Sequence, residues 1–174
     1  MSVENELIWV AMIRQHLGMR IFRNEKLNII LLSLINKCFT ETHQKPFVIN
    51  KNTPISGSFL AAMFMQSGLI DKIPKSFYRP IDWGKVGTEL TKPAYGCVVL
   101  TKKDFVERLG VVVGKTKDGL IKVIGADQGD EINISEYKLD EIQWMRWIGE
   151  TPNPSLYRYD LPLLRDGVIR SKLV

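Results

Sequence analysis

The clearest hydrophobic pattern in the chain covers residues 108–130. Two apolar runs, 109–114 and 120–124, are joined by five polar or glycine residues that end in Asp118-Gly119. β-Branched runs around a short Asp-Gly turn are typical of a β-hairpin. Nearly every residue of both runs is apolar, which predicts strands inside a sheet that is covered on both faces. Arg108 precedes this hairpin and Asp127 follows it, so we expect both side chains at its edge.

Helical periodicity appears three times before the hairpin. Residues 6–17 carry an amphipathic stripe that stops at Gly18, and residues 24–39 carry a second stripe. Residues 53–69 begin with Thr53-Pro54 and are apolar all round. This pattern predicts a buried third helix with Ser56 or Ser58 at its N-terminus.

The remaining pattern predicts an antiparallel sheet. Strands are expected at 97–101, 131–134 and 142–148, a charged loop at 102–107 and irregular structure at 70–89. Helices followed by strands favour the α+β class, with N-terminal helices packed on an antiparallel sheet. Residues 151–174 contain three prolines and no periodicity. We therefore expect a domain of residues 1–150 and a C-terminal extension, 151–174, that wraps it.

Composition suits one soluble domain with a sizeable core. The 174 residues are 45% hydrophobic and 25% charged, and the net charge is +5. Lys and Arg are scattered along the sequence, so we expect no nucleic-acid partner and a solvated basic surface. An anionic polymer such as cell wall would also suit this charge.

The N-terminus predicts the place of synthesis. Residues 1–6 are acidic, no small-residue cleavage site follows, and no apolar run is long enough to span a bilayer. We expect cytoplasmic synthesis without a signal peptide and without a membrane span. Any export would then use a non-standard route.

Candidate reactive groups are few. His16 and His43 are the two histidines, and each is interpreted as structural or solvated. No metal site and no cofactor are expected from so few ligands. Cys38 and Cys97 lack zinc-finger spacing. They form a disulfide only if the fold brings them together, and otherwise are buried thiols in a reducing compartment, the interpretation we favour.

Three stretches in a fixed order carry a family resemblance. They are residues 53–59 (Thr-Pro-Ile-Ser-Gly-Ser-Phe) running to 66–69, residues 95–100 with 108–114, and residues 124–130 (Ile-Gly-Ala-Asp-Gln-Gly-Asp) with Arg146-Trp147. Together they resemble the NlpC/P60–CHAP superfamily of papain-like cell-wall peptidases and amidases, in its small single-domain bacterial and phage branch. The resemblance covers residues 6–148 and implies a papain-like fold.

The resemblance also implies a catalytic triad that this chain lacks. The family places a cysteine nucleophile at a helix N-terminus, a histidine base on the adjacent strand and a polar residue that orients the histidine. Those positions hold Ser56, Arg108 and Asp127 here. Serine needs a base, and arginine stays protonated and cannot be that base. We therefore assign no catalytic residue, and expect binding roles for Ser56, Arg108, Asp127 and Gln128 and an Arg108–Asp127 ion pair.

Three functions remain open at this point. The first is a pseudoenzyme that binds a peptidoglycan fragment or a protein partner through the old active-site cleft. The second is an active peptidoglycan hydrolase that uses Ser56 or another nucleophile, with His43 brought in from its loop. The third is an immunity or adaptor protein that acts through its surface. The sequence does not define the oligomeric state.

Overall fold

In the described part of the chain, three helices precede the sheet, as the sequence predicted. The computed structural model describes residues 6–24, 26–47, 49–126 and 131–164. The helices are α1 (Ile8–Gln15), α2 (Ile29–Glu41) and α3 (Ser56–Gln66). α2 starts later than predicted because β1 (Phe22–Arg23) and β2 (Lys26–Leu27) form a small hairpin before it. The side chain of Asn28 then accepts a hydrogen bond from the amide of Ile30 and caps α2.

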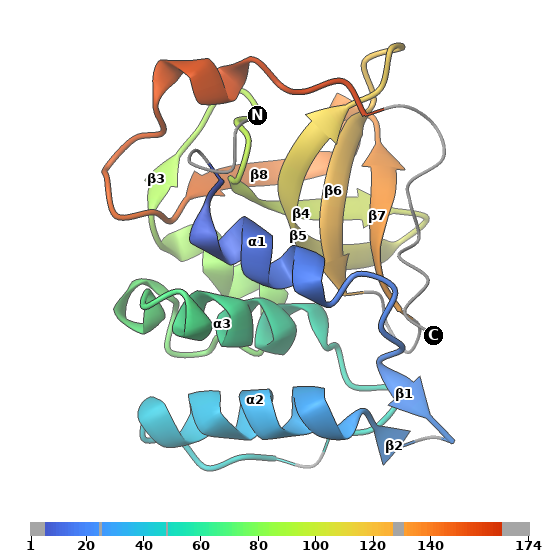
Figure 1. Cartoon of the computed structure of the whole chain (residues 1–174), viewed down its shortest axis with the longest axis vertical. Helices are drawn as coiled ribbons and strands as arrows, with labels where there is room; N and C mark the ends of the chain where they lie inside the picture. Colours follow the sequence, from blue (N-terminus) through green and yellow to red (C-terminus); the bar gives the residue numbers. More distant parts are fainter. Residues whose placement is uncertain (1–5, 25, 48, 127–130, 165–174) are drawn as a thin grey trace.

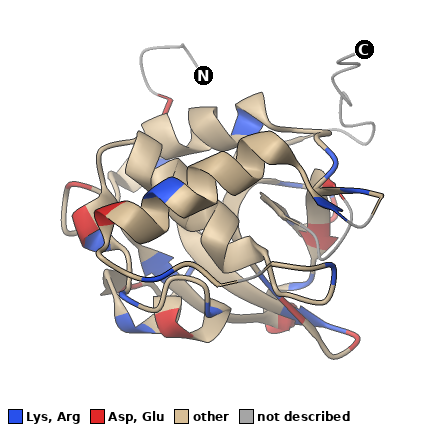
Figure 2. Ribbon diagram, turned by 90° about the horizontal axis from the view of Figure 1, so that it is seen from below, with Lys and Arg blue, Asp and Glu red and all other residues tan. Residues whose placement is uncertain are grey.

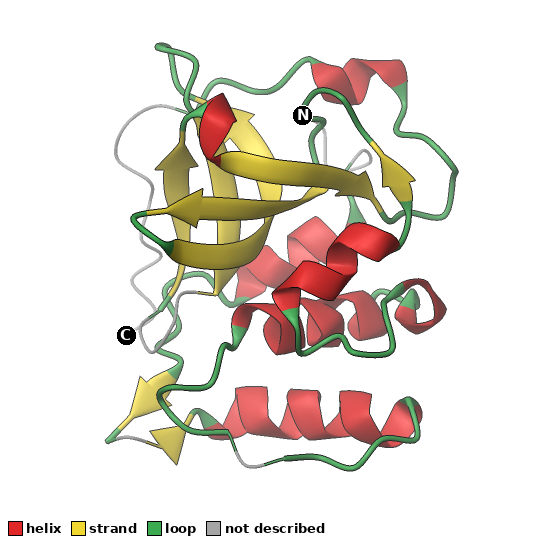
Figure 3. Ribbon diagram, turned by 180° about the vertical axis from the view of Figure 1, so that it is seen from behind, coloured by secondary structure: helices red, strands yellow, loops and turns green. Residues whose placement is uncertain are grey.

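The sheet is antiparallel and comprises six strands among the described residues. They are β3 (Thr88–Glu89), β4 (Val98–Lys103), β5 (Val106–Lys115), β6 (Ile121–Ala126), β7 (Ile132–Tyr137) and β8 (Ile142–Trp147). Their order is β3-β8-β4-β5-β6-β7, so the β5–β6 hairpin lies in the interior of the sheet. This confirms the prediction made from its apolar runs. Seen from behind in Figure 3, β8 runs across the near side of the sheet, and β3 pairs with its end.

The charged loop predicted at 102–107 is wrong. β4 and β5 pair as far as Lys103 opposite Val106, and only Asp104 and Phe105 form the turn. Both turn residues have positive φ, 50° and 64°. The charged side chains are exposed, but backbone pairing extends the strands beyond the core. Strand β7 likewise continues to Tyr137, beyond the predicted end at 134.

The helices form two layers on one face of the sheet (Figure 1). α3 lies between the sheet and α2, and all its residues from Ser56 to Phe64 are buried. α1 packs beside α3, and α2 forms the outer layer. The fold is therefore α+β with a single core that surrounds α3.

Four short 3-10 helices also occur within the described ranges. They are η2 (Ile70–Lys72), η3 (Pro80–Lys85), η4 (Leu139–Glu141) and η5 (Leu156–Tyr159). Residues 151–164 run along the domain and are held by backbone hydrogen bonds. The amide of Tyr95 donates to the carbonyl of Arg158, and the amide of Lys115 donates to the carbonyl of Pro162. Within the described ranges, no helix is long and apolar enough to cross a membrane.

Candidate functional site

Ser56 is the first residue of α3 and points at the central hairpin. Its Oγ accepts a hydrogen bond from the backbone amide of Leu109 on β5, at 3.2 Å, and the residue is only 3% exposed. The pairing of β5 with β6 ends at Gly110, opposite Gly125, so the amide of Leu109 has no partner on β6. The hydroxyl of Ser56 accepts that amide instead. The predicted position of Ser56 at the helix start is confirmed. The start of α3 therefore contacts β5 directly.

Glycines allow this close packing. An added Cβ at Gly57 would overlap the carbonyl oxygen of Phe77, so the first turn of α3 fits only without a side chain there. An added Cβ at Gly110 would lie 2.7 Å from the carbonyl oxygen of Ile124, so β5 and β6 also approach closely. Glycine is thus required in the first turn of α3 and in β5, next to the two residues that the Ser56–Leu109 hydrogen bond joins.

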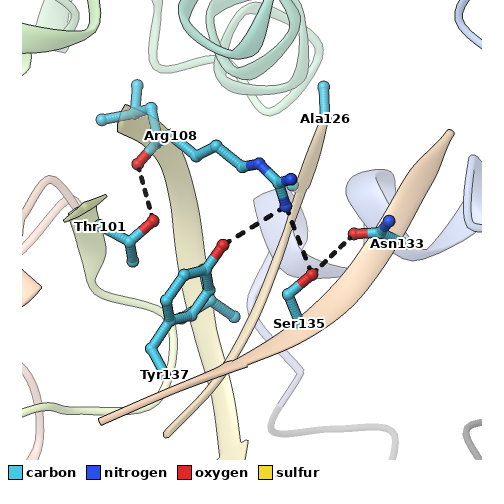
Figure 4. Close-up of a pocket in the computed structure, with 9 residues that line it drawn as sticks. Thr101, Arg108, Ala126, Asn133, Ser135 and Tyr137 are labelled. Atoms are coloured by element: carbon cyan, nitrogen blue, oxygen red, sulfur yellow. Dashed lines mark hydrogen bonds between the residues drawn. The ribbon is translucent and has the colours of Figure 1, made fainter. Parts of the chain in front are cut away.

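Arg108 reaches across the sheet to β7. Its Nη1 lies 3.5 Å from Oγ of Ser135 and 3.4 Å from the hydroxyl of Tyr137, and donates to both (Figure 4). Oγ1 of Thr101 donates to the Arg108 carbonyl at 3.3 Å. Ser135 in turn donates to Oδ1 of Asn133 at 3.1 Å. Arg108 is thus part of a polar cluster on three strands, which the sequence did not predict.

The space beside this cluster is small. The cavity lined by Arg108, Tyr137 and their neighbours has a volume of about 10 Å³, which is room for one water molecule. Its described polar groups are a guanidinium, hydroxyls and an amide. None of these accepts a proton near neutral pH. The cluster can bind a water molecule or a small anion, but its described side chains offer no base.

Asp127 and Gln128 lie in residues 127–130, outside the described residues. The Arg108–Asp127 ion pair and the binding role of Gln128 therefore stay predictions. Ala126, at the end of β6, lines the cavity beside Arg108.

The two histidines differ in their distance from the site. His43 is exposed and follows the end of α2, on the opposite side of the helical layers from the start of α3 (Figure 1). His16 caps the C-terminus of α1, and its ring lies edge-on to Phe59, with centroids 6.1 Å apart. Burial lowers the pKa of His16. Phe59 is one helical turn from Ser56, so His16, not His43, is on the Ser56 side.

Both cysteines are buried free thiols, as we favoured from the sequence. Burial raises the pKa of Cys38 to about 12 and that of Cys97 to about 12. A protonated thiol is a weak nucleophile, so neither cysteine replaces the family's catalytic one. No cluster of three or more metal-ligating side chains occurs among the residues that the structure describes.

Larger depressions lie at another part of the molecule. One of about 260 Å³ lies between the start of α1 and residues 150–158 and is lined by Trp9, Trp147 and Arg158. A second, of about 270 Å³, lies beside Gly87 and Pro152. Neither includes Ser56 or Arg108.

Comparison with known proteins gives no relative. The chain matches no family model and no curated protein, and its fold matches no solved structure.

Proposed function

We propose that the chain is a catalytically degenerate protein of the NlpC/P60–CHAP type, which acts by binding and not by hydrolysis. One observation carries the proposal. The hydroxyl at the family's nucleophile position is buried and accepts the Leu109 amide, next to an arginine at the base position. The start of a buried helix against the central hairpin is the arrangement that the family resemblance implies.

Proton transfer is the missing part of the chemistry. Acyl transfer needs a group that removes a proton from the nucleophile and returns it to the leaving amine. Arg108 remains protonated and already donates to Ser135 and Tyr137. Ser56 has no described base at its hydroxyl and uses that oxygen as an acceptor for the backbone. We therefore assign Arg108 and Ser56 structural roles, as the donor to β7 side chains and as the acceptor for the β5 backbone.

Two binding modes remain, and the described geometry favours one of them. A peptidoglycan fragment would need a cleft beside Ser56 and Arg108, but Ser56 is only 3% exposed. The described cavity at Arg108, which Ser56 does not line, holds about 10 Å³. A sugar or peptide unit is many times larger than the one water that fits. The better-supported mode is that of an adaptor or immunity protein, which binds a protein partner through its outer surface.

Titration with soluble muropeptides tests the binding mode. Amide NMR signals of Leu109 and Ala126 report directly on the site. We expect no saturable shift at these two amides and no cleavage products in the same samples. Saturable shifts without products would restore the old cleft as the binding site. Products that disappear in Ser56→Ala would establish a serine hydrolase and overturn the proposal.

A further inference from the structure

The net positive charge of the chain is concentrated in one segment. Residues 19–52 hold six Lys and Arg against two Glu, whereas the rest of the chain holds eighteen basic and seventeen acidic residues. The segment comprises the β1–β2 hairpin, α2 and the loop after it, which form the layer farthest from the sheet (Figure 1). Its basic side chains are all exposed: Arg20, Arg23, Lys26, Lys37, Lys45 and Lys51.

The outward face of α2 begins with aliphatic side chains. The inward face, which includes Leu31 and Ile35, is buried. In the first turn, however, Ile29 is 80% exposed, Ile30 52% and Leu32 37%. Isolated exposed aliphatic residues are ordinary, but three within one helical turn form an apolar patch.

The basic hairpin lies beside this patch. The amide of Asn28 donates to the carbonyl of Ile21 at 2.8 Å, which fixes the start of α2 next to β1. Figure 2 looks onto this layer and shows basic residues at the hairpin, while α2 is uncharged until Lys37. Glu41 is the acidic side chain of the segment that lies within the described residues, at the far end of α2 and 3.9 Å from Lys37. Glu25, between the two hairpin cations in sequence, lies outside them.

We propose that Ile29, Ile30 and Leu32, together with Arg23 and Lys26, form a docking surface for an anionic lipid bilayer. We call these five residues the α2 corner. Aliphatic side chains that project from a helix insert among lipid headgroups, while flanking cations contact lipid phosphates. A projecting corner suits a fluid surface, which needs no matching pocket. A nucleic acid would match the charge but not the exposed aliphatic side chains.

Co-sedimentation of the full chain with vesicles tests this surface. The probes are vesicles of phosphatidylcholine alone and vesicles that also contain roughly one third phosphatidylglycerol. We expect binding to the anionic vesicles, and binding to the neutral ones at least about tenfold weaker. Raising salt from about 0.1 M to about 0.5 M should weaken the anionic binding, because it screens the charges.

Two pairs of substitutions separate the apolar and the basic parts. Ile29→Ser with Ile30→Ser should weaken binding roughly tenfold, because less apolar surface inserts. Arg23→Gln with Lys26→Gln should weaken it roughly twentyfold, because two cations are lost. All four positions are exposed, so the variants should keep the native circular dichroism spectrum.

Matched controls remove the same groups elsewhere. Phe105→Ser deletes an apolar side chain that is 95% exposed on the β4–β5 turn. Lys103→Gln with Lys117→Gln deletes two exposed cations outside the segment. Each control should change binding less than about twofold.

Several results would overturn the proposal. They are no vesicle binding, equal binding to neutral and anionic vesicles, or controls that lose as much as the α2-corner variants. A loss only in the Arg23/Lys26 variant would show attraction by charge alone, without insertion of the corner. The proposal goes beyond the function proposed above, since none of these outcomes depends on Ser56.

Discussion

Replacing Ser56 by alanine separates a structural serine from a catalytic one. In the folded chain the Ser56 hydroxyl is the acceptor for the Leu109 amide, in a contact that solvent does not reach. Ser56→Ala leaves that buried N–H without this acceptor. An unsatisfied buried donor costs about 1–3 kcal/mol, so we expect a loss near 2 kcal/mol in the free energy of unfolding.

Urea unfolding followed by circular dichroism measures this loss in free energy. In thermal unfolding of a chain of this length, about 2 kcal/mol corresponds to a fall in Tm of roughly 4–8 °C. The matched control is Ser33→Ala on the exposed face of α2, which removes the same hydroxyl and should change stability by only about 0.5 kcal/mol.

The opposite result would refute this structural role. Active-site residues are often held at some expense of stability, so alanine in place of a working nucleophile is commonly neutral or stabilising. If Ser56→Ala is as stable as the parent chain, or more stable, the hydrogen bond between the Ser56 hydroxyl and the Leu109 amide does not stabilise the fold.

Three further outcomes follow from buried or strained groups. Burial lowers the pKa of His16 in the folded chain, so the unfolded chain takes up a proton there at a higher pH than the folded chain does. The free energy of unfolding should therefore be at its full value above about pH 6.5 and fall as the pH drops below it. His16→Gln should flatten this fall in urea midpoints measured from pH 7.5 to pH 5, and an equal fall in the variant would contradict it. With pKa values raised to about 12, Cys38 and Cys97 should not react with a thiol reagent at pH 8 until the chain is denatured; rapid reaction of either in the native chain would show exposure. Phe105 has φ of 64° beside Asp104, so Phe105→Gly should raise stability by about 0.5 kcal/mol in urea unfolding. A destabilised Phe105→Gly would mean that the ring supports the turn.

The hairpin and the helices could be predicted because local pattern determines them. The apolar runs on either side of Asp118-Gly119 predicted two interior strands, and β5 and β6 are those strands. The extension of β4 and β5 through residues 102–107 could not be predicted in this way. Its charged side chains are exposed, and the strand exists there through backbone pairing, which leaves no periodic signal.

The partners of the candidate residues depend on strand register, which the sequence does not contain. The expected Arg108–Asp127 ion pair stays a prediction, because Asp127 lies outside the described residues. The contacts of Arg108 with Ser135 and Tyr137 could not be predicted, because β7 pairs with β6 as far as Tyr137, beyond the short strand that was predicted. The Leu109 amide as the partner of Ser56 likewise follows from how α3 packs on β5.

Hydrolysis of purified peptidoglycan by the unmodified chain tests the central claim most directly. Released muropeptides are measured by mass spectrometry, with Ser56→Ala in parallel and an active amidase as positive control. Because Arg108 stays protonated and Ser56 accepts a backbone hydrogen bond, we predict that the chain and Ser56→Ala release the same background amount. Release by the unmodified chain that Ser56→Ala abolishes would contradict the claim and assign Ser56 as a nucleophile.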